Sequence, residues 1–380
     1  MLGAVLRSKI VFSLPFINYN HLLEAHGHFT FAGWVTPVLM TLFIYELLPE
    51  SISQRLIYQW LLGSIVTCAW GMLLAFAVQG HGTISIILSL GFVVLTWLFG
   101  FIFIRDLVRT KLASCVKWLA LTSILCLILS SSGVIAITYI YFINSFDAIF
   151  YRDALFTYLH FQYNGFFTLA IFAILFNLIE RRMPEKEKKD IYRFSITLCV
   201  SVFPSLFLSY LWQDPNIWLR FVAITGSILL ILSFFFFLIC ARSFRTIYKE
   251  EKPILRFLIL LSMGSFMLKI ILQSFTIFPV IGDAIFGNRP IIMGFLHLVF
   301  LAFVTLFILI YFMKKGILIS QIKWTGIAAI VFAIAVILNE VFLISQGFAA
   351  MFINGSSIFP WLLWMTGILL FIGSLLIAIA

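Results

Sequence analysis

Charged residues are scarce in this chain: Asp, Glu, Lys and Arg make up 11% of its 380 residues. A soluble domain usually carries roughly 25%. Hydrophobic residues account for 63% of the sequence, and the mean hydropathy is +1.13. Long polar stretches are also missing, so no segment can form a separate soluble domain. The composition therefore predicts a polytopic membrane protein surrounded by a lipid bilayer.

Three further absences narrow the function. The five cysteines are scattered without a C-x-x-C pair, which gives no indication of a disulfide framework or a cysteine zinc site. The sequence has no Gly-rich phosphate loop and no nucleophile–base–acid arrangement, so ATP-driven transport and hydrolase chemistry are poorly supported. The net charge of +10 comes from basic loops, and nucleic acid is not expected as a partner.

Apolar runs long enough to cross a bilayer, about 20 residues each, recur along the whole chain. They predict an all-α bundle of eleven transmembrane helices in a single polytopic membrane domain, residues 1–380. No sequence repeat is evident among them. The predicted spans are 26–48, 57–79, 83–104, 115–141, 154–179, 191–212, 217–241, 254–279, 290–313, 323–345 and 358–380.

The orientation follows from the basic residues. Most of the 25 Lys and Arg lie in one set of alternate loops, including the run ERRMPEKEKKD. The positive-inside rule makes this side cytoplasmic, and we expect a bacterial inner (plasma) membrane. Eleven spans leave the N-terminus outside, with Arg7 and Lys9 before the first span. The segment MLGAVLRSKIVFSLPF reads as the tail of a hydrophobic helix, so a bundle of twelve would follow if a leading helix is missing.

All six histidines fall in the outer third of this topology. They are His21, His26, His28, His81, His160 and His297. Ionisable side chains at membrane depth are costly and usually mark function. A neutral imidazole that needs a partner is well served by a metal. The histidines therefore predict a cofactor or metal site toward the outer face.

Spacing around the first span refines this expectation. His26 and His28 lie about 200° apart on a helix, so they can address two different sites but not one ion. His21, Glu24 and His28 share one face if the helix extends upstream to about Asn20, which is a candidate N-cap.

Two kinds of site remain open from the residues alone. Imidazoles from facing helices, such as His28 and His297, could hold a haem between them. A zinc or copper site needs three or four ligands, which His26, His160 and His297 could supply if their helices meet.

Other polar residues lie inside apolar runs. Lys269 and Gln273 belong to the eighth predicted span, and Asn339 and Glu340 lie near the outer end of the tenth. Each could belong to a proton path or to a shell around cofactor carboxylates. The alternatives are snorkelling for Lys269 and an interfacial cap for Glu340.

Three segments carry a family resemblance: HLLEAHGHFTFAGW at 21–34, LHFQYNGFF at 159–167 and GFLHLVF at 294–300. Their order and outer position resemble the catalytic subunits of the haem-copper oxidases and nitric-oxide reductases. The haem- and copper-containing membrane proteins of the nitric-oxide response are similar too. The resemblance implies an oxidase-subunit-I-like bundle with haem, and with copper as a second candidate cofactor, in the outer half of the membrane.

Carried over to this sequence, the resemblance makes His297 and either His28 or His26 the axial pair of a low-spin haem. His160 takes the position of a copper ligand, with His26 and Glu24 as further metal candidates. Second-shell or proton-path candidates are His21, Tyr163, Asn164, Lys269, Asn339 and Glu340. The sixth predicted span has no histidine, and Tyr163 follows His160 at i+3 instead of i+4. A complete copper site is therefore not expected.

The leading interpretation is a haem-binding membrane protein that transfers electrons or binds O2 or NO. A quinol, a cytochrome or a redox partner subunit would supply its electrons. An enzyme of this kind would be an oxidoreductase of the haem-copper type. One alternative is a transporter of a transition metal or small solute, in which the same histidines and Glu24 bind a metal in transit. Another is a non-catalytic subunit that keeps the oxidase-like fold.

Overall fold

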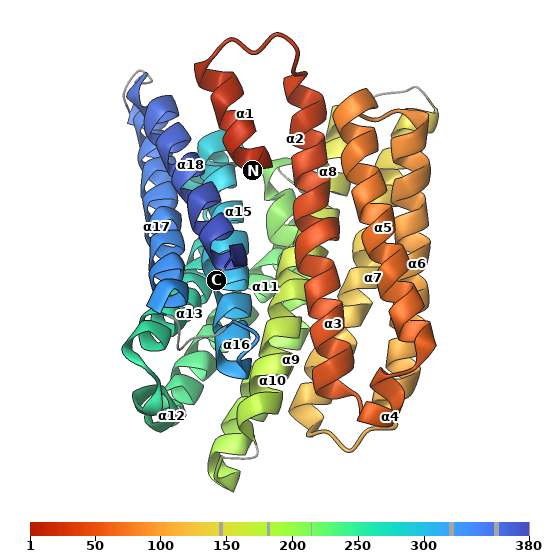
Figure 1. The fold of residues 1–380 in the computed structure, drawn as a ribbon, viewed down its shortest axis with the longest axis vertical. Coiled ribbons are helices and arrows are strands. Elements are labelled where there is room, and N and C mark those ends of the chain that lie inside the picture. Colours follow the sequence, from red (N-terminus) through yellow and green to blue (C-terminus); the bar gives the residue numbers. More distant parts are fainter. Residues whose placement is uncertain (144–146, 181–182, 214, 319–322, 353–356, 380) are drawn as a thin grey trace. The chain divides into compact units, whose positions relative to one another are not determined.

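The computed structural model describes residues 1–143, 147–180, 183–213, 215–318, 323–352 and 357–379, and every regular element in these ranges is a helix (Figure 1). Eleven helices in the described residues are long and apolar enough to cross a membrane. The chain is therefore an all-α multi-pass membrane protein, as predicted. The spans are Tyr19–Leu47, Leu56–Gln79, Thr83–Val108, Ser114–Phe142, Ala148–Ile179, Glu185–Gln213, Ile217–Ser243, Pro253–Phe275, Arg289–Lys315, Trp324–Ala350 and Ile358–Ile379.

Several spans begin or end some residues away from the predicted boundaries. The first span begins at Tyr19, seven residues before the predicted start, because the histidine-rich segment is itself helical. The fifth begins at Ala148. The carboxylate of Asp147 caps this helix by accepting hydrogen bonds from the backbone N–H groups of Ile149 and Phe150. The eighth ends at Phe275, since Pro279 starts a separate short helix.

The helices form two compact units, each described here by itself. Unit 2 comprises residues 20–243 and contains the first seven spans. Its most buried helix is the fifth span: 78% of its most apolar window is buried, against 28% for the second span. Its helices are α2 (Tyr19–His28), α3 (Thr36–Leu47), α4 (Glu50–Ser53), α5 (Leu56–Gln79), α6 (Thr83–Val108), α7 (Ser114–Phe142), α8 (Ala148–Leu159), α9 (Thr168–Ile179), α10 (Glu185–Ser205), the 3-10 helix η4 (Leu206–Gln213) and α11 (Ile217–Ser243).

Phenylalanine rings form much of the unit 2 core. Phe172 lies edge-on to Phe194 at 4.9 Å between ring centroids, and both contact Phe237 from α11. These three rings join α9, α10 and α11 by apolar burial, with edge-to-face pairs adding about 0.5–1.5 kcal/mol each. The fifth span is therefore held on several sides, which fixes the orientation of the polar side chains that it carries.

Unit 1 comprises residues 1–19 and 244–380. Its core includes Leu258, Leu306, Ala333 and Val336, which are fully buried. Its helices are α1 (Leu2–Val11), α12 (Arg245–Glu250), α13 (Pro253–Phe275), α14 (Pro279–Phe286), α15 (Arg289–His297), α16 (Leu306–Lys315), α17 (Lys323–Phe352) and α18 (Ile358–Ile379).

The short helix α1 packs along α18, which lies beside it in Figure 1. Arg7 fixes this arrangement, because its guanidinium donates to the backbone carbonyl of Leu363 at 2.6 Å and to the hydroxyl of Thr366 at 3.2 Å. A third bond runs to Oδ1 of Asn339 on α17 at 2.5 Å. One arginine thus links three helices of unit 1 through buried polar atoms.

Three of the spans are not α-helical throughout. The first contains the π-helical segment η1 (Phe29–Val35), the fifth contains η2 (His160–Phe167) and the ninth contains η5 (Leu298–Thr305). π-helices are rare in proteins, usually occur as single widened turns and are frequent at functional sites. The positions of these three segments therefore direct attention to the residues beside them.

Candidate functional site

A histidine stands at the head of each π-helical segment. His28 is the residue before η1, His160 is the first residue of η2, and His297 is the residue before η5. Each of the three segments that carry the family resemblance contains one of these histidines. The structure thus gives them a common local setting, which spacing within the sequence did not reveal.

The three segments also share a nine-residue pattern. They read HFTFAGWVT at 28–36, HFQYNGFFT at 160–168 and HLVFLAFVT at 297–305. Each has histidine first, an aromatic residue fourth, glycine or alanine sixth, an aromatic residue seventh and threonine ninth. The expectation that the spans contain no repeat is therefore wrong at this scale. Surrounding apolar residues hide the pattern, because hydropathy does not distinguish one phenylalanine-rich helix from another.

The ninth residue serves the widened turn. The hydroxyl of Thr168 donates to the carbonyl of Tyr163 at 2.6 Å, and that of Thr305 donates to Phe300 at 2.7 Å. In the first segment the backbone N–H of Thr36 bonds to the carbonyl of Phe31. Each acceptor lies five residues earlier and is the fourth residue of its pattern. The threonine thus satisfies a carbonyl that the widening moves out of the α-helical ladder.

A serine from the preceding span binds two of the three segments. Ser123 on α7 donates to the carbonyl of Phe166, and Ser262 on α13 donates to the carbonyl of Phe303, both at 2.9 Å and both buried. Phe166 and Phe303 are each the seventh residue of their pattern. The repeat therefore includes a contact to the neighbouring helix as well as the local sequence.

His28 belongs to an aromatic cluster at the predicted outer end of unit 2. Its ring stacks on Phe76 of α5 at 4.0 Å between centroids, with the planes 11° apart. His81, in the turn between α5 and α6, lies edge-on to His28 at 6.3 Å and stacks on Tyr141 at 4.5 Å. The ring nitrogens of His28 make no hydrogen bond within the described part of the chain. Burial lowers the pKa of His81 to about 4, so its imidazole is neutral at pH 7.

Two acid–base side chains of α2 face the same turn. Glu24 Oε1 lies 3.3 Å from Nε2 of His81, and its second carboxylate oxygen is buried without a hydrogen-bond partner among the described residues. Nδ1 of His21 lies 3.2 Å from the carbonyl of Val78, at the end of α5. His21, Glu24 and His28 therefore share one face of α2, as predicted. Asn20 is not the N-cap, because the helix already begins at Tyr19.

His160 is fully buried, with both ring nitrogens in hydrogen bonds. Nε2 donates to the carbonyl of Val202 at 2.8 Å, and Nδ1 accepts from the amide of Asn164 at 3.0 Å. In a regular α-helix the backbone N–H of Leu206 would donate to the Val202 carbonyl. At the tightened end of α10 it donates to the carbonyls of Phe203 and Pro204 instead, so the Val202 carbonyl can accept from His160. A metal could bind His160 only by displacing one of these bonds. The role of His160 as a copper ligand stays a prediction.

His297 presents a different arrangement. Its Nδ1 donates to the carbonyl of Met293, one turn earlier on α15, at 2.9 Å. A neutral imidazole with its proton on Nδ1 carries its lone pair on Nε2. Metal-ligating histidines usually have their other nitrogen fixed in this way by a carbonyl or carboxylate. The Nδ1 bond of His297 is thus of the kind that orients a metal-ligating histidine.

Buried polar residues of unit 1 lie at the level of His297. Helix α17 runs antiparallel to α15: Gly347 faces Ile291, and Leu343 faces Gly294. Following this register one turn along each helix places Glu340 level with His297. Glu340 is 8% exposed; one of its carboxylate oxygens accepts from Asn339 at 2.9 Å, and the other has no hydrogen-bond partner in the part of the chain that the structure describes. This burial disagrees with the alternative of an interfacial cap.

Lys269 on α13 lies at the same level as His297. The hydrogen bond from Ser262 to Phe303 fixes the register of the two spans. Counting from that bond, Lys269 lies seven residues after Ser262, and His297 lies six residues before Phe303. The side chain of Lys269 is 1% exposed, and its ammonium lies 5.9 Å from the ring centroid of Phe266. This burial disagrees with the alternative of snorkelling. One turn away, the side-chain amide oxygen of Gln273 is buried and has no hydrogen-bond partner within the described ranges. The polar residues singled out in the eighth and tenth spans are thus interior ones.

The remaining site predictions are not tested. In the described residues, no three His, Cys, Asp or Glu side chains form a group that could hold a metal ion. His26 accepts a hydrogen bond from Thr30 through its backbone carbonyl. His28 and His297 belong to different units, so their pairing across a haem also stays a prediction.

No protein-family model matches this chain, and no curated protein matches it in sequence.

Proposed function

We propose that this membrane protein binds haem and uses it to transfer electrons or to bind a diatomic gas such as O2 or NO. His297 and His28 are assigned as iron ligands. The observation that carries the proposal is the repeated π-helical segment with a histidine at its head. Widened turns of this kind are frequent at functional sites, and these three occur where the family resemblance to the haem-copper oxidases places cofactor ligands.

The side chains fit an iron ligand at two of the three positions. At His297, the bond from Nδ1 to the Met293 carbonyl fixes the tautomer and the ring orientation, as a backbone carbonyl does for many metal-ligating histidines. At His28, the ring lies flat on Phe76 and neither nitrogen is used in a hydrogen bond within the described residues. His160 does not fit without rearrangement, since both of its nitrogens are bonded to protein.

When bound, haem supplies one-electron chemistry and an iron that can bind O2 or NO. The residues of this chain would orient and shield it. The Met293 carbonyl holds the His297 ring in place. Phe76 and Tyr141, on helices α5 and α7, surround the turn that carries His81 and limit the access of water to His28. We also propose a quinol or cytochrome as electron donor and a bacterial inner membrane as location, on the strength of the resemblance and of the basic loops.

The first test is an optical spectrum of the detergent-purified protein, oxidised and reduced, with metal analysis of the same sample. A Soret band with sharp reduced α and β bands is expected after expression with ample haem. His297→Ala and His28→Ala should each abolish or shift these bands. His26→Ala decides between the two ligand candidates of α2: because His26 lies outside the repeated pattern, the spectrum of this variant should equal that of the wild type, and loss of the bands would assign the ligand to His26 instead.

A colourless protein under these conditions would overturn the haem proposal. Copper or zinc in such a sample, lost on replacing Glu24 or His81, would support a transition-metal transporter instead. A colourless protein without metal would support a non-catalytic subunit.

A further inference from the structure

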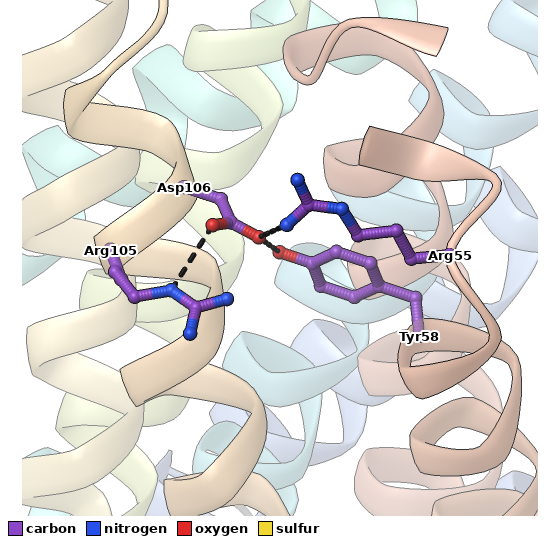
Figure 2. Close-up of polar contacts among 4 residues, drawn as sticks. All are labelled: Arg55, Tyr58, Arg105 and Asp106. Carbon is purple, nitrogen blue, oxygen red and sulfur yellow. Dashed lines mark hydrogen bonds and ion pairs between the residues drawn. The ribbon is translucent and has the colours of Figure 1, made fainter. Parts of the chain in front are cut away.

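Asp106 is a buried acid at the predicted cytoplasmic end of unit 2. Its carboxylate is 1% exposed and accepts from three side chains on two helical segments (Figure 2). Tyr58 donates its hydroxyl at 3.0 Å, Arg55 donates through Nη1 at 3.4 Å, and Arg105 donates through Nε at 3.2 Å. The two guanidiniums reach the carboxylate from opposite sides, one from the start of α5 and one from the end of α6 (Figure 2).

The charges in this cluster do not cancel. Two guanidiniums share one carboxylate, which leaves an excess of one positive charge. Each arginine uses one nitrogen on Asp106, and neither contacts another acceptor within the described residues. Both side chains are 47% exposed, so the other nitrogens of each fork are open to a ligand from outside the protein. A guanidinium fork matches the geometry of a phosphate group, and Asp106 holds two such forks in place.

The surface beside the cluster is apolar. On α5, Leu56 and Trp60 are 68% and 72% exposed, and on α6 Phe101 and Val108 are 72% and 57% exposed. Tryptophans exposed near the ends of membrane spans lie at the level of the lipid head groups. The ligand that fits this site therefore has a phosphate at one end and long apolar chains at the other, which is the chemistry of a phospholipid.

We propose that Arg55 and Arg105, held by Asp106, bind the phosphate of an anionic phospholipid whose acyl chains lie along Trp60 and Phe101. Anionic lipids attract basic side chains at the cytoplasmic surface by about 1 kcal/mol for each residue. Exposed arginines at a membrane surface are common; the distinguishing feature here is the buried carboxylate, which fixes both forks before a lipid arrives. The site is independent of the haem proposal, since none of its residues belongs to the histidine cluster.

The test measures lipid binding to the full chain in a neutral detergent, by native mass spectrometry and by thermal unfolding during titration. Phosphatidylglycerol should bind and raise the unfolding temperature, whereas phosphatidylcholine should do so much less. Arg105→Gln should weaken phosphatidylglycerol binding about fivefold. Arg109→Gln is the matched control: it removes an exposed charge from the same end of α6 without touching Asp106, and should leave the affinity nearly unchanged.

Two results would overturn the proposal. Inorganic phosphate that raises the unfolding temperature as much as phosphatidylglycerol would assign the site to a soluble phosphate compound. Equal losses in Arg105→Gln and Arg109→Gln would show a diffuse basic surface without a built site. If Arg105→Gln does not fold, Arg105→Lys keeps the charge beside Asp106 but removes the fork; phosphatidylglycerol affinity equal to wild type in that variant would also overturn the proposal.

Discussion

The hydroxyl of Ser262 donates to the backbone carbonyl of Phe303 inside a π-helical turn, across 2.9 Å, from the neighbouring span. Ser123 makes the same bond to Phe166, at the same distance and at the same place in the repeated pattern. A widened turn leaves carbonyls without their α-helical partners, and a buried carbonyl without a donor costs free energy. These serines thus supply a donor from outside the helix and stabilise an irregular segment that would otherwise be expensive in a membrane.

Ser262→Ala should destabilise the protein, because it removes a buried hydrogen bond to the Phe303 carbonyl, which then keeps only the bond from the backbone N–H of Leu306. The expected loss is about 0.5–1.5 kcal/mol in the free energy of unfolding. Thermal unfolding in detergent micelles would measure it. Ser374→Ala is the control in the same unit, since Ser374 is exposed and bonds only to Phe371 of its own helix. Equal unfolding temperatures for the two variants would contradict the assigned role of Ser262.

Asn164→Leu should also destabilise the protein. Leucine is similar in size to asparagine but cannot donate a hydrogen bond, so Nδ1 of the buried His160 would lose its donor. The expected loss is about 1–3 kcal/mol. The double variant with His160→Phe gives the sharper measurement: with both polar partners gone, the combined loss should be smaller than the sum of the two single losses. Strict additivity would show that the two side chains do not depend on each other.

Gly165→Ala tests how closely η2 packs on α7. A Cβ at position 165 would lie 2.4 Å from Cβ of Cys126, so the helices must move apart at a cost of about 1–3 kcal/mol. Gly27→Ala is the matched control in the first span, because a Cβ there meets nothing within 4 Å. That variant should be neutral or gain up to about 1 kcal/mol from helix propensity. Similar unfolding temperatures for both alanine variants would contradict the tight contact.

Stability should fall at mildly acidic pH because of His81. Its pKa is lowered by burial from 6.5 to about 4. Above pH 6.5 the imidazole is neutral in both states, and its contribution is complete. Between pH 6.5 and 4 the unfolded chain takes up a proton that the folded protein does not, so stability decreases by up to about 1.4 kcal/mol per pH unit. Below pH 4 this group adds no further loss.

The measurement is the unfolding temperature of the wild type and of His81→Phe between pH 7.5 and 4.5. Phenylalanine keeps the stacking on Tyr141 but cannot titrate, and Glu24 remains beside the ring in both proteins. The variant should lose less stability than the wild type as the pH falls. Parallel curves would show that His81 is not the group responsible.

Hydropathy predicted the eleven spans, because length and apolar composition suffice for that purpose, and helical spacing predicted the shared face of His21, Glu24 and His28. Neither signal could locate the π-helical turns, since the widening depends on which carbonyls find donors and not on apolar content. The partners of His160 include a backbone carbonyl from residue 202, which no side-chain pattern reveals. The nine-residue repeat was readable in the sequence, but only by aligning the segments on their histidines.

The Asp106 cluster was missed for a different reason. Counting basic residues loop by loop gives a prediction of the orientation but treats Arg55 and Arg105 as equivalent charges. The positions of the two guanidiniums depend on the carboxylate of Asp106, which also accepts a hydrogen bond from the hydroxyl of Tyr58. A single acidic residue at the end of an otherwise apolar span is the signal that could have drawn attention to it.

The π-helical segments also have a consequence for how these helices tolerate changes in length. Each widened turn accommodates one residue beyond what an α-helix would need, so its two flanks face as they would in an α-helix that lacks that residue. Removing one residue from an α-helical stretch turns everything beyond it by about 100°, whereas removing one residue inside η1, η2 or η5 lets the turn relax to α-helix with both flanks still in register. Single-residue deletions should therefore be best accepted at the very segments that hold the histidines, with folding retained and ligand geometry lost.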